Sequence, residues 1–108
     1  MAGEPSHFEI GVPDPERAQA FYGRLLGWSF DGTDRGARIS TTGIGGGLHP
    51  DEPWIQVFYR VDDLDAAAAR VVELGGTVGE GRSEGPGGRY LHDCRDDQGV
   101  PFGLHEAA

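Results

Sequence analysis

His7 and Glu9 are the first pair of side chains in this chain whose types and spacing are suited to chemistry. They alternate with Phe8 and Ile10, which predicts a strand with an imidazole and a carboxylate on one face and apolar side chains on the other. An imidazole beside a carboxylate can act as a general base with an orienting partner. The pair can equally be hydrogen-bonded polar lining of a wet cavity, and both interpretations stay open.

Glycine and histidine recur together in the two halves of the chain. The triplet Gly47-Leu48-His49 is repeated as Gly103-Leu104-His105. Glycines leave a strand face without side chains, so we expect Gly47 and Gly103 to open space for a ligand. A histidine near a strand end is commonly a surface or capping residue. Together with His7, however, His49 and His105 would supply three ligands to a displaced metal site.

Aromatic and thiol side chains complete the set of candidates. Trp54, Gln56 and Phe58 share one face of a predicted strand, and we expect the two aromatic residues to contact a planar or apolar ligand. Cys94 has only Arg95 as an adjacent cation, which favours an inert buried thiol over a nucleophile.

A repeat determines how the chain positions these residues. A shift of 49 residues lays 56–78 over 7–29 without a gap, and it aligns Asp14 with Asp63 and Gly27 with Gly76. These are the predicted cap and stop residues of two helices, so the chain contains two copies of one supersecondary unit.

In the first copy we expect strands at 7–12, 28–31 and 35–42, a helix that starts after Asp14 and stops at Gly27, a glycine-rich fourth segment at 43–48 and a linker at 49–53. In the second we expect strands at 54–61 and 77–79, a helix at 62–74, a mobile loop at 80–88 and a closing hairpin of 89–94 and 100–106. The predicted buried positions are Ala18, Phe21, Tyr22, Leu25 and Leu26 on the first helix, Leu64, Ala67, Val71 and Leu74 on the second, and Ile55, Val57 and Tyr59 on the helix side of the strand at 54–61.

Composition limits the classes of protein that fit. The 108 residues make one domain, and the net charge of −9 argues against a nucleic-acid or anionic membrane partner. No apolar run approaches the roughly 20 residues of a membrane span. The N-terminus lacks a secretory pattern and Cys94 is the single cysteine, so we expect a cytoplasmic protein.

The segments HFEIGVPDPERAQAFYGRLLGW, VDDLDAAAARVVELGGTV and DDQGVPFGLHE resemble the vicinal oxygen chelate superfamily, which includes glyoxalase I, bleomycin-resistance proteins and extradiol dioxygenases. The resemblance spans residues 6–106. It implies an α+β fold within a single domain, 1–108, in which two βαβββ modules, about 6–50 and 54–106, form curved sheets around one cavity, with the helices outside.

In metal-dependent members of this superfamily, a divalent ion is held by the first and last strands of each module. The resemblance carries these positions onto His7, Gln56, Gly47 and Gly103. Glycine has no side chain, and two ligands are too few for a catalytic metal. We therefore expect no metal and no other cofactor.

The leading hypothesis is a protein similar to the antibiotic-sequestering members, which binds a small molecule in the cavity without a catalytic metal. The alternatives are a metal-dependent lyase or dioxygenase, a metal-free acid/base enzyme that uses His7 and Glu9, and an interaction module with a vestigial cavity. We expect a homodimer, because short strands leave edges and apolar surface that pairing would cover. The predicted ligand-binding residues are His7, Glu9, Gly47, His49, Trp54, Gln56, Phe58, Gly103 and His105.

Overall fold

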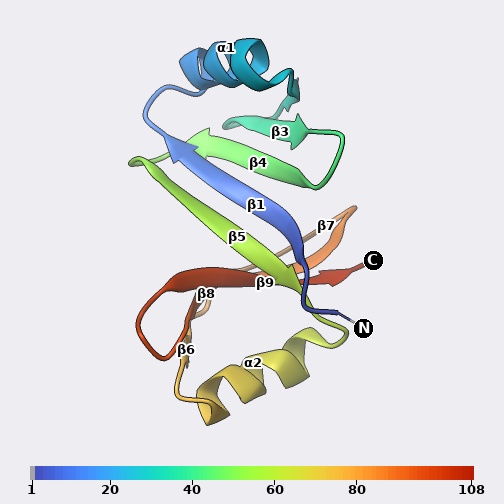
Figure 1. The fold of residues 1–108 in the computed structure, drawn as a ribbon, viewed down its shortest axis with the longest axis vertical. Coiled ribbons are helices and arrows are strands. Elements are labelled where there is room, and N and C mark those ends of the chain that lie inside the picture. The colour runs from blue at the N-terminus through green and yellow to red at the C-terminus, as the bar shows by residue number, and fades with distance from the viewer. Residues whose placement is uncertain (1) are drawn as a thin grey trace. The chain divides into compact units, whose positions relative to one another are not determined.

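The structure, a computed structural model, describes residues 2–108 as two compact units. The N-terminal unit is His7–Gln56, and the C-terminal unit combines the residues up to Ser6 with Val57–Ala108. Each unit has one helix packed on strands, so the chain is α+β (Figure 1). None of the helices in the described residues is long and apolar enough to cross a membrane.

The N-terminal unit follows the order strand, helix, strand, strand, strand. Its elements are β1 (Pro5–Val12, which begins in the C-terminal unit), α1 (Pro15–Leu26), β2 (Ser29–Gly32), β3 (Ala37–Ser40) and β4 (Gly45–Pro50). The strands lie in the order β2-β3-β4-β1. β1 runs parallel to β4, and the other pairs are antiparallel.

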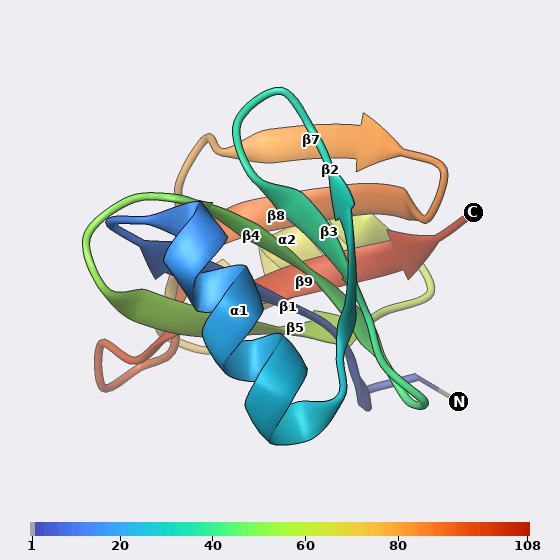
Figure 2. The same ribbon diagram turned by 90° about the horizontal axis from the view of Figure 1, so that it is seen from above.

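The C-terminal unit repeats this order with one additional strand. Its elements are β5 (Trp54–Arg60, which begins in the N-terminal unit), α2 (Leu64–Glu73), β6 (Thr77–Val78), β7 (Arg82–Gly85), β8 (Gly88–Arg95) and β9 (Pro101–Ala107). The strands lie in the order β5-β9-β8-β6, and β5 is parallel to β9 as β1 is to β4. The segment 80–88 contains β7, which pairs with β8, so the prediction of a loop throughout is wrong (Figure 2).

The helix caps are at predicted residues, although α2 spans Leu64–Glu73 and is shorter than the predicted 62–74. Asp14 Oδ1 accepts a hydrogen bond from the amide of Arg17 at 3.2 Å, and Asp63 Oδ1 accepts one from Ala66 at 3.0 Å. Gly27 ends α1 with a φ of 74°, a left-handed conformation that favours glycine.

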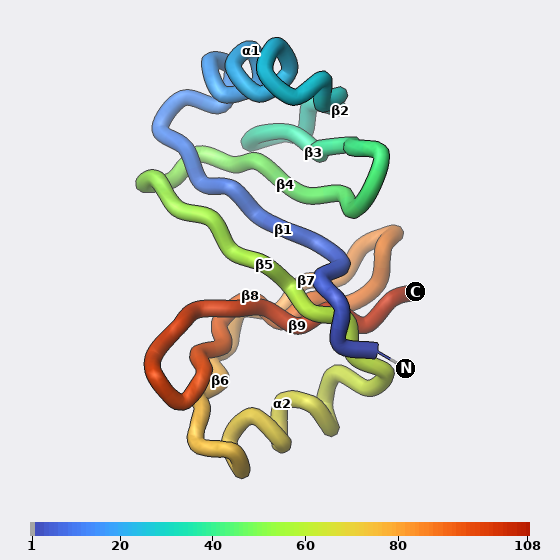
Figure 3. The backbone as a smooth tube through the Cα atoms, in the orientation of Figure 1, coloured from blue at the N-terminus to red at the C-terminus, as the bar shows by residue number. Residues whose placement is uncertain are grey.

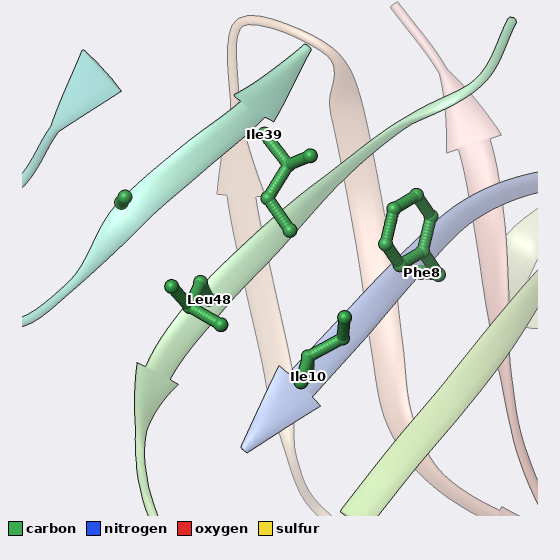
Figure 4. Packing of buried hydrophobic residues seen from close by; sticks show 5 residues of the cluster. Phe8, Ile10, Ile39 and Leu48 are labelled. Atoms are coloured by element: carbon green, nitrogen blue, oxygen red, sulfur yellow. The ribbon is translucent and has the colours of Figure 1, made fainter. Parts of the chain in front are cut away.

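Each unit has its own apolar core. In the N-terminal unit the core is formed by Phe8, Ile10, Ala37, Ile39 and Leu48 (Figure 4). In the C-terminal unit it is formed by Leu64, Ala68, Leu91, Cys94 and Leu104.

Part of the predicted buried set is exposed. Phe21, Leu25 and Leu26 have exposed fractions of 61%, 63% and 51%, because α1 contacts the short strands beneath it only through the stripe that contains Ala18 and Tyr22. Leu74 follows the last residue of α2 and is also exposed. Ala67 and Val71 pack against the core of the C-terminal unit as expected.

The two faces of β5 are those that the sequence pattern predicts, because Tyr59 is opposite the core residue Leu104 and Phe58 is opposite Gly103 on the other face, but the burial of their side chains differs from the expectation. Ile55 and Tyr59 are exposed, whereas Phe58 is completely buried. The reason is the partner strand, because Phe58 pairs with Gly103 of β9 and its ring lies over that glycine. The predicted linker at 49–53 is also shorter than expected, since His49 and Pro50 belong to β4.

Candidate functional site

The sheet of the N-terminal unit has one apolar face and one polar face. Residues directly opposite one another on paired strands point to the same side of a sheet. Phe8, Ile10, Ala37, Ile39 and Leu48 form the core on one side, so the residues between them lie on the other. We call this second side the polar face, and its members are His7 and Glu9 on β1, Arg38 and Ser40 on β3, and Gly45, Gly47 and His49 on β4.

Glu9 is the centre of a hydrogen-bonded network on the polar face. Its Oε2 atom lies 2.5 Å from Nε2 of His7, and its Oε1 atom lies 3.2 Å from Nδ1 of His49. The exposed fractions of the side chains are 16% for Glu9, 19% for His7 and 32% for His49, so solvent reaches all three. The structure therefore adds His49 to the pair of His7 and Glu9 that the sequence predicts.

The network continues into the turn that joins β4 to β5, and Figure 3 shows the path of the backbone through this turn. Nε2 of His49 lies 3.6 Å from Oδ2 of Asp51, and the indole N–H of Trp54 donates to the same oxygen at 2.9 Å. The amide of Glu52 donates to the other oxygen of Asp51. These bonds, that of Trp54 first, hold the pKa of Asp51 below its usual range, so the carboxylate is charged at neutral pH. The ring of His49 also contacts the ring of Trp54 edge to face.

Two glycines make room for this network. A Cβ atom on Gly47 would lie 2.5 Å from Oε2 of Glu9, so the carboxylate occupies the place where a side chain at position 47 would begin. A Cβ atom on Gly11 would lie 2.7 Å from Nε1 of Trp54. A ligand contact at Gly47 stays a prediction, and in this structure the carboxylate of Glu9 fills the space beside it.

The space beside Gly103, the equivalent glycine of the C-terminal unit, is filled by a side chain as well. A Cβ atom on Gly103 would lie 2.7 Å from Cγ of Phe58 and still closer to two other ring atoms. Phe58 is fully buried, and its ring contacts the rings of Tyr90 and His92. Neither Phe58 nor Gly103 presents open surface in this arrangement.

His105 is a structural residue of the C-terminal unit. Its Nδ1 atom is 2.8 Å from the hydroxyl of Ser6, and its Nε2 atom is 2.8 Å from the carbonyl oxygen of Gly87. Its ring stacks on Tyr90 with centroids 4.5 Å apart. Because a carbonyl can only accept, Nε2 carries the proton and Nδ1 accepts from Ser6, so both ring nitrogens are engaged.

Sequence reasoning missed three side chains of this region. Asp51 was placed in a linker, and Arg38 and Ser40 were assigned to a strand with no role. For Arg38 and Ser40 the signal is the strand register, since only the pairing of β3 with β4 brings Arg38 opposite Gly47. Gln56 is half-buried near the start of β5 and has contacts within the molecule.

The residues at the positions implied for a metal do not fit one. Two of those positions are glycines that neighbouring side chains cover, and the carboxylate of Glu9 is engaged by imidazole nitrogens. Within residues 2–108, no group of three or more His, Cys, Asp and Glu side chains is arranged to hold a metal ion. His7, Glu9 and His49 contact one another instead of converging on a common point.

Two other features of the C-terminal unit, a thiol and a surface depression, offer no reactive or unpaired charged group. Cys94 is buried, and burial raises the pKa of its thiol to about 11, so the thiol is a poor nucleophile. A surface depression of about 310 Å³ is lined by Leu64, Arg82, Ser83, Glu84, Arg89 and Tyr90. Its two arginines are paired with Asp65 and Glu106, which neutralise them.

The fold and the polar face define the class of protein: two βαβββ-type units, each with its helix on one side of its sheet. Residues 5–104 match the family model of the Glyoxalase/Bleomycin resistance protein/Dioxygenase superfamily, and the chain belongs to this superfamily. A glyoxylase-like domain-containing protein from Didymella fabae is 32% identical over 91 residues, covering 70% of this chain and 71% of that one.

Solved structures with a similar fold agree with this assignment. Methylmalonyl-CoA epimerase from Mycobacterium tuberculosis is 27% identical and has a TM-score of 0.67, with 98% of this chain and 88% of that chain covered. A hypothetical protein from Bacillus halodurans C-125 has a TM-score of 0.74 at 15% identity, with 98% of this chain and 95% of that chain covered, which supports the fold alone.

Proposed function

We propose that this protein binds a small organic molecule on the polar face of its N-terminal unit, without a catalytic metal. The observation that carries the proposal is the position of Glu9, whose two carboxylate oxygens are held by His7 and His49 in a partly exposed network. Polar side chains with fixed orientation on a concave or open surface are the usual means by which a site orients a ligand. Trp54, which is 36% exposed beside His49, supplies an apolar contact.

The test is an unbiased small-molecule screen by thermal shift. A ligand present at 100 times its dissociation constant should stabilise the wild-type chain by about 2.7 kcal/mol. Glu9→Gln should abolish the shift because it removes the charge that holds both imidazoles. Glu16→Gln, on the exposed first turn of α1, is the matched control and should keep it. Hits that stabilise both variants equally would contradict the proposed site.

The absence of a catalytic metal is tested separately. Elemental analysis of the purified protein should find no stoichiometric transition metal, and chelators should leave the thermal shift unchanged. One metal per chain or per dimer, lost in His7→Ala, would contradict this part of the proposal.

A second candidate function is metal-free proton transfer, and a specific observation favours it. A carboxylate that contacts two imidazoles is a set of acid and base groups in one place, and one similar structure of 27% identity is a methylmalonyl-CoA epimerase. Glu9 would remove the proton next to a carbonyl, which leaves an enolate, and a solvent proton would return to the carbon. Incubation with methylmalonyl-CoA in D₂O should then incorporate deuterium at that carbon, and Glu9→Gln should not.

We also propose a cytoplasmic location, because the single cysteine is buried and free, as in proteins of a reducing compartment.

A further inference from the structure

Arg38 and Ser40 stand beside the network of Glu9 on the polar face. In the register of the sheet, Arg38 of β3 is opposite Gly47 of β4, which in turn is opposite Glu9 of β1. Continued by one residue, the same register places Ser40 opposite Gly45, which is opposite His7. The glycines of β4 thus separate two polar strands, with β3 on one side and β1 on the other.

The space above β4 between these two strands is unfilled at Gly45. A Cβ atom on Gly45 would meet only the carbonyl oxygen of Ile39, at 3.2 Å, whereas a Cβ atom on Gly47 would run into the carboxylate of Glu9. Gly45 therefore leaves room on the polar face that Gly47 does not. The side chains on either side of this room are Ser40 and His7.

Arg38 is the permanent cation of this face, and it has no partner. Arg60, Arg82, Arg89 and Arg95, the other arginines on strands, each form an ion pair or a hydrogen bond. In the described residues Arg38 forms neither, although Asp31 of β2 is its register partner. Elsewhere in residues 2–108 the side chains of Arg17, Arg24 and Arg35 form no ion pair either, so Arg38 is distinguished by its place on the polar face and not by the lack of a partner. This place is consistent with a role in binding.

We propose that Arg38, with Ser40 and His7, binds the carboxylate group of the small molecule over Gly45. The inference rests on the proposed function, since it names the chemical class of the ligand at that site. A guanidinium offers two parallel N–H donors that match the two oxygens of a carboxylate, and the serine hydroxyl adds a third donor. A singly charged carboxylate is favoured over a doubly charged phosphate because the net charge of −9 repels the phosphate more strongly.

The experiment uses sodium acetate as the probe and the full chain labelled with ¹⁵N. Titration should give saturable shifts of the Gly45 amide and of the Arg38 Nε signal at constant ionic strength. Arg38→Gln should abolish the shift of the Gly45 amide. Arg38→Lys should weaken the Gly45 shift, because it keeps the charge and loses the paired donors. Arg35→Gln changes an exposed arginine of the turn between β2 and β3 and is the matched control that should keep both shifts.

Each other outcome overturns the inference. Shifts that persist in Arg38→Gln, or that fail to saturate in the wild-type chain, would show that acetate does not bind through this arginine. Inorganic phosphate that binds more tightly than acetate would overturn the choice of a carboxylate. The acetate titration and the thermal-shift screen are independent experiments. If acetate does not bind but the screen finds uncharged ligands whose effect depends on Glu9, the carboxylate site is refuted and the proposed function stands.

Discussion

Glu9 and Phe58 occupy equivalent positions of the two units. The shift of 49 residues aligns them in the sequence, and each is opposite the glycine of its parallel partner strand, Gly47 or Gly103. Both side chains lie over that glycine, but one is a carboxylate and the other a phenyl ring. The same backbone geometry therefore holds a polar network in the N-terminal unit and an aromatic cluster in the C-terminal unit.

This difference predicts unequal costs for the same substitution at the two glycines. Gly103→Ala should lower the free energy of unfolding by about 1–3 kcal/mol, because the methyl group collides with the buried ring of Phe58. Gly47→Ala should cost less than about 1 kcal/mol, since the end of the Glu9 side chain can turn away. Denaturant unfolding of both variants measures the difference.

Gly47→Ala should also disturb the hydrogen bonds of Glu9 to His7 and His49. This effect distinguishes it from a substitution that the fold simply tolerates. Displacement of Glu9 should alter the ¹⁵N signals of the imidazoles of His7 and His49, and should leave those of His105 unchanged. Equal unfolding free energies for the two alanine variants would mean that Phe58 is not confined above Gly103 as described.

At the scale of elements, the carboxylate of Glu106 joins α2 to the closing hairpin. Its Oε1 atom accepts a hydrogen bond from the amide of Leu64 at the start of α2, and its Oε2 atom accepts one from Arg89 of β8 at 2.8 Å. The hydrogen bond from Arg89 first, and that from Leu64 second, hold the pKa of Glu106 below its usual range. The charged form of Glu106 is thus favoured in the folded chain.

A lowered pKa in the folded state predicts how stability depends on pH. The contribution of Glu106 should be present above the pKa of an unfolded glutamate and should be lost as the pH falls through the lower folded pKa. Glu106→Gln should therefore be less stable than the wild-type chain at neutral pH, and the difference should shrink in acid. Thermal unfolding from neutral to acidic pH measures it, with the exposed Glu84→Gln as control. A difference that stays constant with pH would rule out this linkage.

Most elements could be predicted from the sequence because their signals are local. The caps at Asp14 and Asp63, the stop at Gly27 and the alternation of β1 all depend on neighbours in the chain. The burial of the side chains of β5 could not be predicted, because Phe58 is buried over a glycine that lies 45 residues further on and is brought opposite it only by strand pairing. Arg38 was missed for the same reason, because only strand pairing brings it opposite Gly47.

At the scale of the whole molecule, the order of elements follows from the repeat and the family from the resemblance of three segments, whereas the candidate site depends on register. His7 and Glu9 were paired correctly from their spacing. His49 joins them because Gly11 is opposite His49, which places its ring one step along the sheet from Glu9. A two-residue change of register between β1 and β4 would separate these side chains without any change in the sequence pattern.

The exposed apolar side chains of α1 predict self-association. Phe21, Leu25 and Leu26 are all more than half exposed, and contiguous apolar surface of this kind marks an interface. Light scattering at tens of micromolar should give the mass of a homodimer. Leu25→Arg should convert it to a monomer by placing a charge in the contact, whereas Leu74→Arg, at an equally exposed leucine after α2, should leave the dimer intact. A monomeric wild-type chain would contradict the assembly, and a dimeric Leu25→Arg variant would exclude α1 as the contact surface.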